Sequence, residues 1–591
     1  MTVRCCSPVF FFTTFFILTF CNCSRLCVLD SAFVSCRNPS FSPLITSKKG
    51  NKPLPVETTF KIPAPVPKWP QGDYKGNGFA SGAIDLGELK VSRITTFNKV
   101  WTAREGGPNN LGATFYEPIS IPEGFSVLGY YSQPNNQALY GWVMVAKDVR
   151  NDQFRQALAL PTDYTLVWSS DSQKIKQDGI GYIWLPVPSN GYKAVGHVVT
   201  NSSEKPSLDK IRCVRSDLTV DIETDNWIWG PKSRFNVYSS RPVVRGIQAS
   251  SVATGTFVAK KDGDAPSLSC LKNMKNDLSS MPNLDQIQAL FKAYSPVVYF
   301  HPKEEYFPSS VSWFFQNGGL LYTKGQESKP VEIEPTGSNL PQNGSDDGAY
   351  WLDLPTDKTA SEKVKKGDLA DAGVYLHVKP ALGGTFTDIA VWIFYPFNGA
   401  ARAKIEFVTV SLGRIGEHVG DWEHVTLRIS NFDGELKSVY FSQHNKGSWV
   451  SVSNLEFEKD NKPVVYASLH GHAAYPQAGL VVQGTASIGI RNDTSRGNVV
   501  MDTGSRYLVV GAEYLGASKI VEPPWLNYAR KWGPKITYNI NDELSRVKKL
   551  LPGMLKTKFD GVIKSLPPEV LGEQGPTGPK WKDNWSGDER V

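Results

Sequence analysis

The chain has 591 residues, which at roughly 100–200 residues per domain predicts about two to four domains. Hydrophobic residues make up 40% and aromatic residues 12% of the chain, while Gly (51) and Pro (40) are frequent and amphipathic helical patterns are scarce, which favours a mostly β fold with many turns. A net charge of +7 is mild for this length, and no basic stripe or recognition motif is present, so we expect no nucleic-acid partner.

The amino-terminal residues have the composition of a targeting segment. Arg4 precedes an apolar run from Pro8 to Phe20, as in a secretory signal, and this run is shorter than the roughly 20 residues of a membrane span. The Ser/Thr-rich, acid-poor surroundings are equally typical of a transit peptide, and a mis-assigned start is a third interpretation. In the body only Cys213 and Cys270 occur, which favours a reducing compartment. Secretory, plastid and cytoplasmic or endomembrane-peripheral locations therefore all stay open.

The first folded region contains an internal repeat. Gly129 follows Trp101 by the same 28 residues by which Gly196 follows Trp168, and a looser third copy begins at Trp229. Each copy has the pattern of short strands separated by Gly, Asn and Pro turns. Small sheets that cannot each bury a core pack around a common axis, which predicts a three-repeat β-prism, a fold that commonly binds membranes or sugars. A β-sandwich with accidental Trp and Gly spacing is the alternative.

The second folded region begins with a helix. From Asn283 to Tyr294, Leu284, Ile287 and Leu290 recur on one helical face. Strands are then predicted at 296–300, at the fully apolar and therefore central run 389–397, at 424–430, at 438–444 after the Asn-Phe-Asp-Gly turn, and at 463–472. A β-sandwich is the expected architecture.

One motif in this region concentrates chemistry. The run from His418 to His424 reads HVGDWEH, and the strict apolar/polar alternation that follows predicts a β-strand. Side chains two residues apart share a face, so Asp421 and Glu423 point the same way at the end of an apolar face, where unpaired charge is costly. His418 can fold back over them beside Gly420. A divalent cation held by these three side chains satisfies the cluster, and a salt bridge to an Arg or Lys is the alternative.

Further polar residues are candidates for the same site. His470 and His472 share strand parity, and with Glu417 they are predicted to orient the ligands or to transfer protons. Glu417, Asp421 and Glu423 also permit a metal-dependent hydrolase acting on phosphoesters or glycosides, although no other motif points to such a substrate. We therefore expect a non-enzymatic site and keep the hydrolase as the alternative.

These motifs carry a family resemblance. The 418–424 run, Ser468 to Pro476, Gly575 to Lys580 and the Gly/Asn blocks at 78–82 and 109–113 resemble the plant branch of the vacuolar protein sorting-associated protein 62 family over about residues 55–591. The resemblance implies a role in vacuolar protein transport, with membranes and trafficking proteins as partners.

A more distant likeness concerns the site alone. The spacing His418-x-x-Asp421-x-Glu423 is similar to the heptapeptide of the necrosis- and ethylene-inducing toxins. That resemblance implies a β-sandwich whose histidine and two acids hold a divalent cation and which binds sphingolipid head groups. In those toxins an aspartate completes the site, whereas Asn398 stands at the comparable place here. Mixed oxygen and nitrogen ligands suit Mg, Ca or Mn, and lipid or glycan head groups are the implied ligands.

The carboxyl-terminal residues combine lysines with an apolar stripe. Such helices lie on anionic lipid or, more often, pack on their own domain. The predicted organisation is an extension (1–55), a β-prism-like repeat domain (56–260), a linker (261–283), a β-sandwich (284–540) and a basic amphipathic segment with a Gly/Pro-rich tail (541–591).

Overall fold

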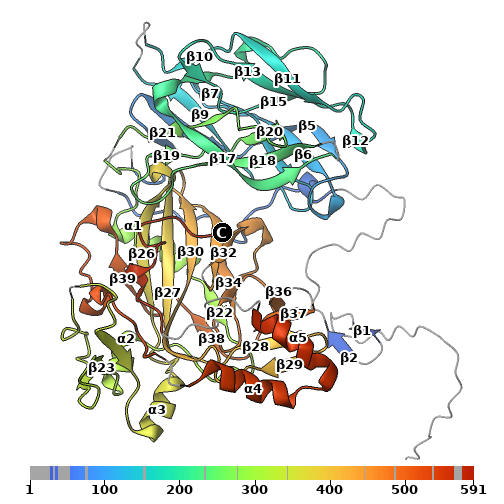
Figure 1. Cartoon of the computed structure of the whole chain (residues 1–591). Helices are drawn as coiled ribbons and strands as arrows, with labels where there is room; N and C mark the ends of the chain where they lie inside the picture. The colour runs from blue at the N-terminus through green and yellow to red at the C-terminus, as the bar shows by residue number, and fades with distance from the viewer. Residues whose placement is uncertain are drawn as a thin grey trace, which may run out of the picture. The chain divides into compact units, whose positions relative to one another are not determined.

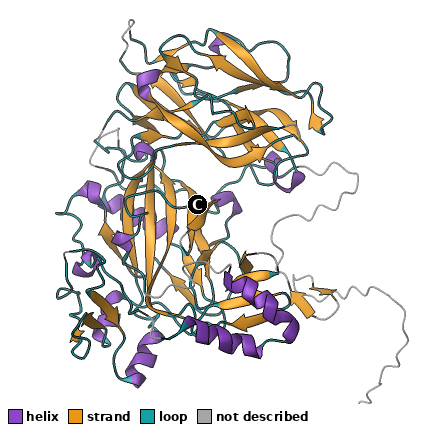
Figure 2. Ribbon diagram, viewed as in Figure 1, coloured by secondary structure: helices purple, strands orange, loops and turns teal. Residues whose placement is uncertain are grey.

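A computed structural model describes residues 27–30, 33–36 and 54–591, apart from 73–77, 151–154, 232–233, 276, 343, 445, 485–486, 536–537 and 565–574. Residues 1–54 and 55–591 form two compact units. In the first unit only a hairpin of β1 (Cys27–Asp30) and β2 (Phe33–Cys36) is described, so the predicted targeting segment lies almost wholly outside the described residues. The second unit consists mostly of antiparallel sheets with few helices (Figure 2), which confirms the predicted mostly β class.

The amino-terminal half of the second unit consists of short strands in several small sheets (Figure 1). They are β3 (Ala83–Asp85), β4 (Leu89–Ile94), β5 (Phe97–Ala103), β6 (Ala113–Pro118), β7 (Ser126–Val127), β8 (Tyr131–Pro134), β9 (Val143–Asp148), β10 (Leu158–Ala159), β11 (Asp163–Ser169), β12 (Gln177–Asp178), β13 (Tyr182–Val187), β14 (Tyr192–Lys193), β15 (Val198–Thr200), β16 (Cys213–Arg215), β17 (Thr219–Trp229), β18 (Phe235–Pro242), β19 (Ser251–Val252), β20 (Phe257–Lys261) and β21 (Ser269–Lys272). Because β21 pairs with β17, this part of the predicted linker is a strand of the repeat region.

The predicted repeats meet through their equivalent residues. Trp101, Trp168 and Trp229 form one cluster with ring centroids 5.2–5.7 Å apart. At Gly129 an added Cβ would lie 2.5 Å from the Cα of Gly196, so the two repeats approach closely only because both positions lack a side chain. Each tryptophan lies on a strand of a different antiparallel sheet, β5, β11 or β17. The sequence spacing therefore marked residues that share one core.

The carboxyl-terminal half contains the longer strands and all the α-helices described. They are α1 (Leu284–Tyr294), β22 (Val297–Tyr299), α2 (Val311–Gln316), β23 (Leu320–Thr323), β24 (Val331–Glu332), β25 (Tyr350–Asp353), α3 (Lys358–Lys365), β26 (Val374–Ala381), β27 (Phe386–Asn398), β28 (Arg402–Ile405), β29 (Val408–Ser411), β30 (His418–Ser430), β31 (Leu436–Gln443), β32 (Lys446–Ser451), β33 (Phe457–Glu458), β34 (Lys462–Ala467), β35 (Ala474–Tyr475), β36 (Gly479–Gly484), β37 (Ile488–Thr494), β38 (Val500–Asp502), β39 (Tyr507–Gly511), α4 (Ile540–Leu550) and α5 (Gly553–Lys564).

A six-stranded sheet with the order β32-β31-β30-β27-β26-β39 organises this half. β27, the predicted central strand, is buried along its whole length, because both faces of the sheet are covered. One face packs Val425, Leu427 and Ile429 into one core, and the other packs Trp422 into a second, aromatic core. The alternation read from the 418–430 sequence is thereby confirmed, as are the α1 helix, whose Asn283 forms a capping box, and the β30–β31 hairpin.

The basic carboxyl-terminal segment forms α4 and α5, which pack on a second sheet with the order β29-β28-β37-β36. Val547, Leu551, Leu555 and Phe559 are buried against Ile405 and its neighbours. The apolar stripe thus packs on its own domain. Among the described helices, none is long and apolar enough to span a membrane.

Candidate functional site

The HVGDWEH motif lies at the end of the central sheet, where β30 begins and the antiparallel β27 ends. His418 pairs with Asn398 across the two strands, and Asp421 pairs with Tyr395. Gly420 has a φ of +65°, and a Cβ there would lie 2.7 Å from a backbone carbonyl oxygen. This left-handed position, which favours glycine, bends the strand so that the His418 Nδ1–H donates to the Gly420 carbonyl at 3.1 Å. The candidate residues of β27 and β30 therefore lie together at one end of the sheet.

A cavity of about 410 Å³ opens at this end of the sheet. Its wall contains His418, Asp421, Glu423 and Asn398, which are the four predicted ligands. The remaining lining residues are Gly399, Ala400, Ala401, Arg402, Gly416, Trp422, His444, Leu469, Gly471, Ile490, Arg491, Asn492, Lys531, Gly575, Pro576 and Lys582. The cavity thus combines two carboxylates in its wall with several cationic side chains.

His472 connects the site to a third carboxylate. The predicted strand 463–472 is wrong at its end, because β34 stops at Ala467 and His472 lies in the following turn with a φ of +53°. There its ring stacks on Tyr395, its Nδ1 lies 3.0 Å from Asp421 Oδ2, and its Nε2 lies 3.0 Å from the Tyr306 carbonyl oxygen. Burial opposes a charged ring, but Asp421 and Glu304 outweigh it and raise the pKa of His472 to about 9. His472 is therefore an imidazolium that holds Asp421 in place.

The four predicted ligands keep acceptor atoms that face no donor among the described residues. Asp421 uses Oδ2 toward His472, and Glu423 accepts from the Ser442 hydroxyl through Oε2 at 2.9 Å, which leaves Oδ1 and Oε1 without a hydrogen bond. His418 donates through Nδ1, so its Nε2 carries the lone pair. Asn398 donates only through Nδ2, to the carbonyls of Gly399 and Gly416. A ligand in the cavity would meet these acceptors first.

The alternative interpretation of the motif was a salt bridge to an Arg or Lys, and a lysine does lie at this place. Lys582, from the carboxyl-terminal tail, lines the cavity, and its ammonium donates to the Trp422 carbonyl at 3.3 Å. Burial lowers the pKa of Lys582, although the charges of Glu423 and Asp421 oppose this shift. Burial and the neighbouring Asp421 raise the pKa of Glu423 to about 8, while Lys582 works in the opposite direction. The pKa values of these two neighbouring acids thus shift in opposite directions. Burial would raise the pKa of Asp421, but the contact with His472 outweighs burial and lowers it.

The remaining predicted residues lie at different distances from the cavity. Glu417 pairs with Arg414 at 3.5 Å and faces a separate cavity of about 330 Å³ on the other side of His418. The His470 Nδ1 lies 3.5 Å from Glu304 Oε1, and the His470 backbone N–H donates to Glu304 Oε2 at 2.7 Å. In the described part of the chain, no three His, Cys, Asp or Glu side chains are arranged so that they could hold a metal ion together.

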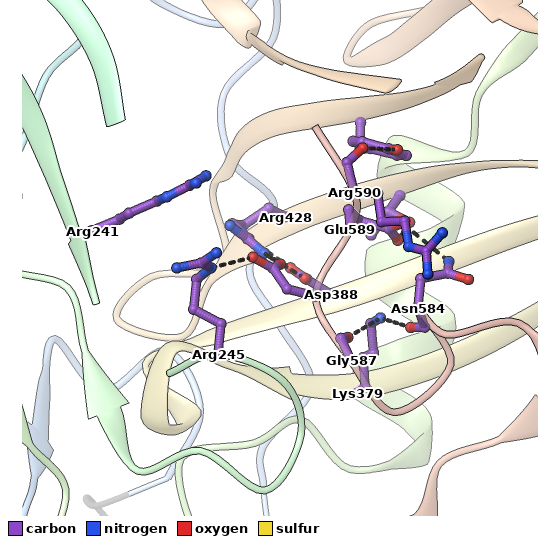
Figure 3. A network of polar contacts seen from close by, with 12 residues as sticks. Arg241, Arg245, Lys379, Asp388, Arg428, Asn584, Gly587, Glu589 and Arg590 are labelled. Atoms are coloured by element: carbon purple, nitrogen blue, oxygen red, sulfur yellow. Dashed lines mark hydrogen bonds and ion pairs between the residues drawn. The ribbon is translucent and has the colours of Figure 1, made fainter. Parts of the chain in front are cut away.

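The opposite face of the same strands is covered by the carboxyl-terminal tail, which Figure 3 shows crossing the sheet. Glu589 is 5% exposed and accepts from Thr426 at 2.6 Å and from Asn584 at 3.0 Å, with His424 Nε2 also at 3.0 Å. Asp588 pairs with Arg245 of the repeat region at 2.7 Å. The tail that brings Lys582 to the cavity is therefore anchored by polar contacts of Asp588 and Glu589, which follow Lys582 in the chain.

Three residues of the site were missed by the sequence analysis: Lys582, Glu304 and Ser442. Lys582 and Glu304 lie on elements distant in sequence from the motif, whereas Ser442 lies on β31, the strand that follows β30 in the predicted hairpin. The closest signal was the 575–580 run, which belongs to the same tail as Lys582.

Fold and site together define a mostly β protein with a polar cavity at the end of its central sheet. Residues 56–589 match the family described as "Vacuolar protein sorting-associated protein 62". The chain belongs to this family, and the predicted family resemblance is confirmed.

Two proteins of Saccharomyces cerevisiae are similar over part of the chain. Putative vacuolar protein sorting-associated protein TDA6 is 24% identical over 262 residues, which cover 37% of this chain and 53% of the relative. Vacuolar protein sorting-associated protein 62 is 25% identical over 221 residues, which cover 31% and 44%. The chain thus spans about half the length of the curated relatives it matches.

Solved structures are similar at lower levels. GNIP1Aa from Chromobacterium piscinae is 20% identical over 35% of this chain and 40% of its own, with a TM-score of 0.27. Necrosis and Ethylene inducing Protein 2 from the causal agent of cocoa's Witches Broom disease is 14% identical over 36% and 70%, with a TM-score of 0.18. At these TM-scores neither structure carries an argument.

Proposed function

We propose that this chain is a non-enzymatic, membrane-associated factor of vacuolar protein sorting whose cavity binds a lipid or glycan head group. The observation that carries the proposal is the set of unused acceptor atoms on Asp421, Glu423, His418 and Asn398, which face a cavity of about 410 Å³ beside the Lys582 ammonium. These atoms line the cavity wall and form no hydrogen bond with the described residues, so they are available to a ligand that enters the cavity.

The chemistry of the wall favours a hydroxyl-rich, anionic head group. Sugar or inositol hydroxyls donate hydrogen bonds, as the unused carboxylate oxygens require. Phosphate oxygens accept them, and Lys582, Lys531 and Arg491 line the same cavity. The volume falls within the roughly 300–1,000 Å³ of typical ligand pockets. A single ligand that carries both hydroxyl and phosphate groups therefore matches the acidic and the basic side chains of the wall.

A divalent cation is part of the proposal. His418, Asp421 and Glu423, with the Asn398 amide oxygen, would hold Mg, Ca or Mn, since oxygen-rich sets suit these ions. The His418 tautomer fits this role, because Nδ1 is occupied by the Gly420 carbonyl and Nε2 is the free nitrogen. Bound there, the cation would supply positive charge for an anionic head group. The side chains must move closer together for this.

The two halves of the second unit have separate roles in this proposal. The repeat region is a three-fold β-prism that adds a second binding surface for membranes or sugars, supported by the shared Trp101, Trp168 and Trp229 core. The second half is a β-sandwich that carries the cavity. Trafficking proteins are the proposed protein partners.

Binding of soluble head groups tests the function directly. A panel of inositol phosphates, sugar phosphates and glycerophosphoesters is titrated with and without a chelator. We expect Asp421→Asn and Glu423→Gln to abolish binding of the probes that bind the native chain, and Glu417→Gln to leave it unchanged, since Glu417 faces the other cavity. Loss of binding in Glu417→Gln alone, or no binding of any probe, overturns the proposal. Turnover of a probe that disappears in Asp421→Asn supports the hydrolase instead.

A further inference from the structure

The tip of the β28–β29 hairpin exposes a phenylalanine without a structural role. The strands pair Ile405 with Val408, so Glu406 and Phe407 form a two-residue turn. Phe407 is 83% exposed, whereas the flanking Ile405 is fully buried. The described contacts of Phe407 include no aromatic or apolar partner. Single exposed apolar side chains are common on protein surfaces, so Phe407 suggests an external partner only together with the exposed Met554 of the neighbouring helix.

The tip is held firmly by the neighbouring helix. Glu406 has a φ of +55°, and its Oε1 accepts from Lys558 of α5 at 2.5 Å. On α5, Leu555 and Phe559 are buried against the sheet, while Met554 is 77% exposed. Figure 1 shows β28 and β29 lying beside α4 and α5. Phe407 therefore projects from a packed base and not from a loose loop.

The two helices beside the hairpin carry more basic than acidic side chains. The described parts of α4 and α5 carry Arg546, Lys548, Lys549, Lys556 and Lys558 against Asp542, Glu543 and Asp560. In the part of the chain that the structure describes, Lys549 and Lys556 have no carboxylate partner, while Lys548 pairs with Asp560. An anionic bilayer suits such a surface. Its hydrocarbon region can accommodate the exposed apolar side chains, and its head groups attract the unpaired lysines.

We propose that this tip, with Phe407 at its end and with Met554, Lys549 and Lys556 on the two helices packed beside it, inserts into an anionic lipid bilayer and presents the cavity to the head groups. Arg402, at the other end of β28, lines the cavity. Three strand residues and Glu406 of the turn separate it from Phe407, a distance of at most about 16 Å at the usual rise of roughly 3.3 Å per residue. Interfacial apolar groups enter about 5–10 Å below the surface. The cavity mouth then lies about 5–10 Å outside the bilayer, within reach of a sugar- or phosphate-bearing head group.

This inference rests on the proposed function for the role of the cavity, and vesicle flotation of the whole chain tests it. Phosphatidylcholine vesicles with and without phosphatidylserine are the probes. We expect Phe407→Ser to weaken binding to the anionic vesicles by about tenfold or more, the usual effect of withdrawing one aromatic side chain from hydrocarbon. Lys549→Glu with Lys556→Glu should remove the preference for phosphatidylserine. Val521→Ser, which changes an equally exposed apolar side chain elsewhere, serves as the control.

The outcomes separate the two proposals. If Phe407→Ser binds vesicles as well as the native chain does, or if Val521→Ser loses as much binding, the docking tip is refuted. Phe407→Ser should leave the binding of soluble head-group probes unchanged. A loss of that binding also refutes the docking tip, because it would show that the substitution disturbs the fold. If vesicle binding depends on Phe407 while Asp421→Asn changes no head-group binding, the docking tip stands and the proposed function fails.

Discussion

Replacing Glu589 by Gln tests how strongly the carboxyl-terminal tail is anchored to the sheet that carries the site. Burial disfavours the charged carboxylate, but the His424 charge, the His424 hydrogen bond and Lys379 outweigh it and lower the pKa of Glu589 from 4.5 to about 2. Thr426 donates to the same carboxylate at 2.6 Å. The side chain therefore stabilises the folded state only while it is ionised.

The size of the effect follows from this shift. A difference of about 2.5 pKa units corresponds to about 3 kcal/mol at about 1.4 kcal/mol per unit. Because the pKa of the folded state is the lower one, this stabilisation is fully present above pH 4.5 and is lost as the pH falls from about 4.5 toward 2. The Gln side chain keeps the shape and one acceptor but not the charge. Glu589→Gln should thus lower the free energy of unfolding by about 3 kcal/mol at pH 7.

Denaturant unfolding at several pH values measures this difference. We expect the gap between the native chain and Glu589→Gln to be constant from pH 7 to about 5 and to shrink below pH 4.5. Glu123→Gln, at an exposed position, is the matched control and should leave the free energy of unfolding unchanged. A gap that stays the same down to pH 3, or an equal loss in the control, would refute the ionic anchor and leave only a packing effect.

Three further substitutions test the site and the repeat core. Lys582→Met should raise the affinity for Ca²⁺ or Mn²⁺ by about tenfold or more in calorimetric titrations, because a nearby like charge shifts such an equilibrium by a unit or more; an unchanged affinity contradicts this. His197 is buried, which lowers its pKa to about 4, so stability should fall between pH 6.5 and 4 by up to about 3 kcal/mol, and His197→Asn should remove that dependence. Gly420→Ala should cost about 2 kcal/mol or more in unfolding free energy, and Gly179→Ala, at a similar φ in open space, clearly less.

Much of the fold was predictable, because local patterns specify it. The alternation after Glu423 predicted which face of β30 is buried, and the fully apolar run 389–397 predicted the central strand. The shared spacing of Trp101 and Trp168 pointed to residues that pack together. The end of β34 was not predictable, because His472 adopts a left-handed conformation that its contacts with Asp421 stabilise, and those contacts are far apart in sequence.

Of the site, only residues that line the cavity could be predicted from the sequence. His418, Asp421, Glu423 and Asn398 were named from spacing and resemblance, and they do line one cavity. Charge compensation was not predictable in the same way, because it depends on groups brought in by other elements. Glu304 precedes the motif by more than a hundred residues and Lys582 follows it by more than a hundred, so only the tertiary structure brings them to the carboxylates.

The charges of this cluster explain why a cation site and a salt bridge both remained as interpretations of the sequence. Asp421 and Glu304 have lowered pKa values and face His472, whose pKa is raised, while burial raises the pKa of Glu423 to about 8 and lowers that of Lys582. Basic groups of the chain therefore compensate part of the negative charge without a divalent ion. A cation that binds there has to compete with His472 and Lys582, so the tail lysine weakens the site that the motif provides. Cation affinity in the proposed function should therefore depend on where the tail holds Lys582, and the Glu589 anchor sets that position.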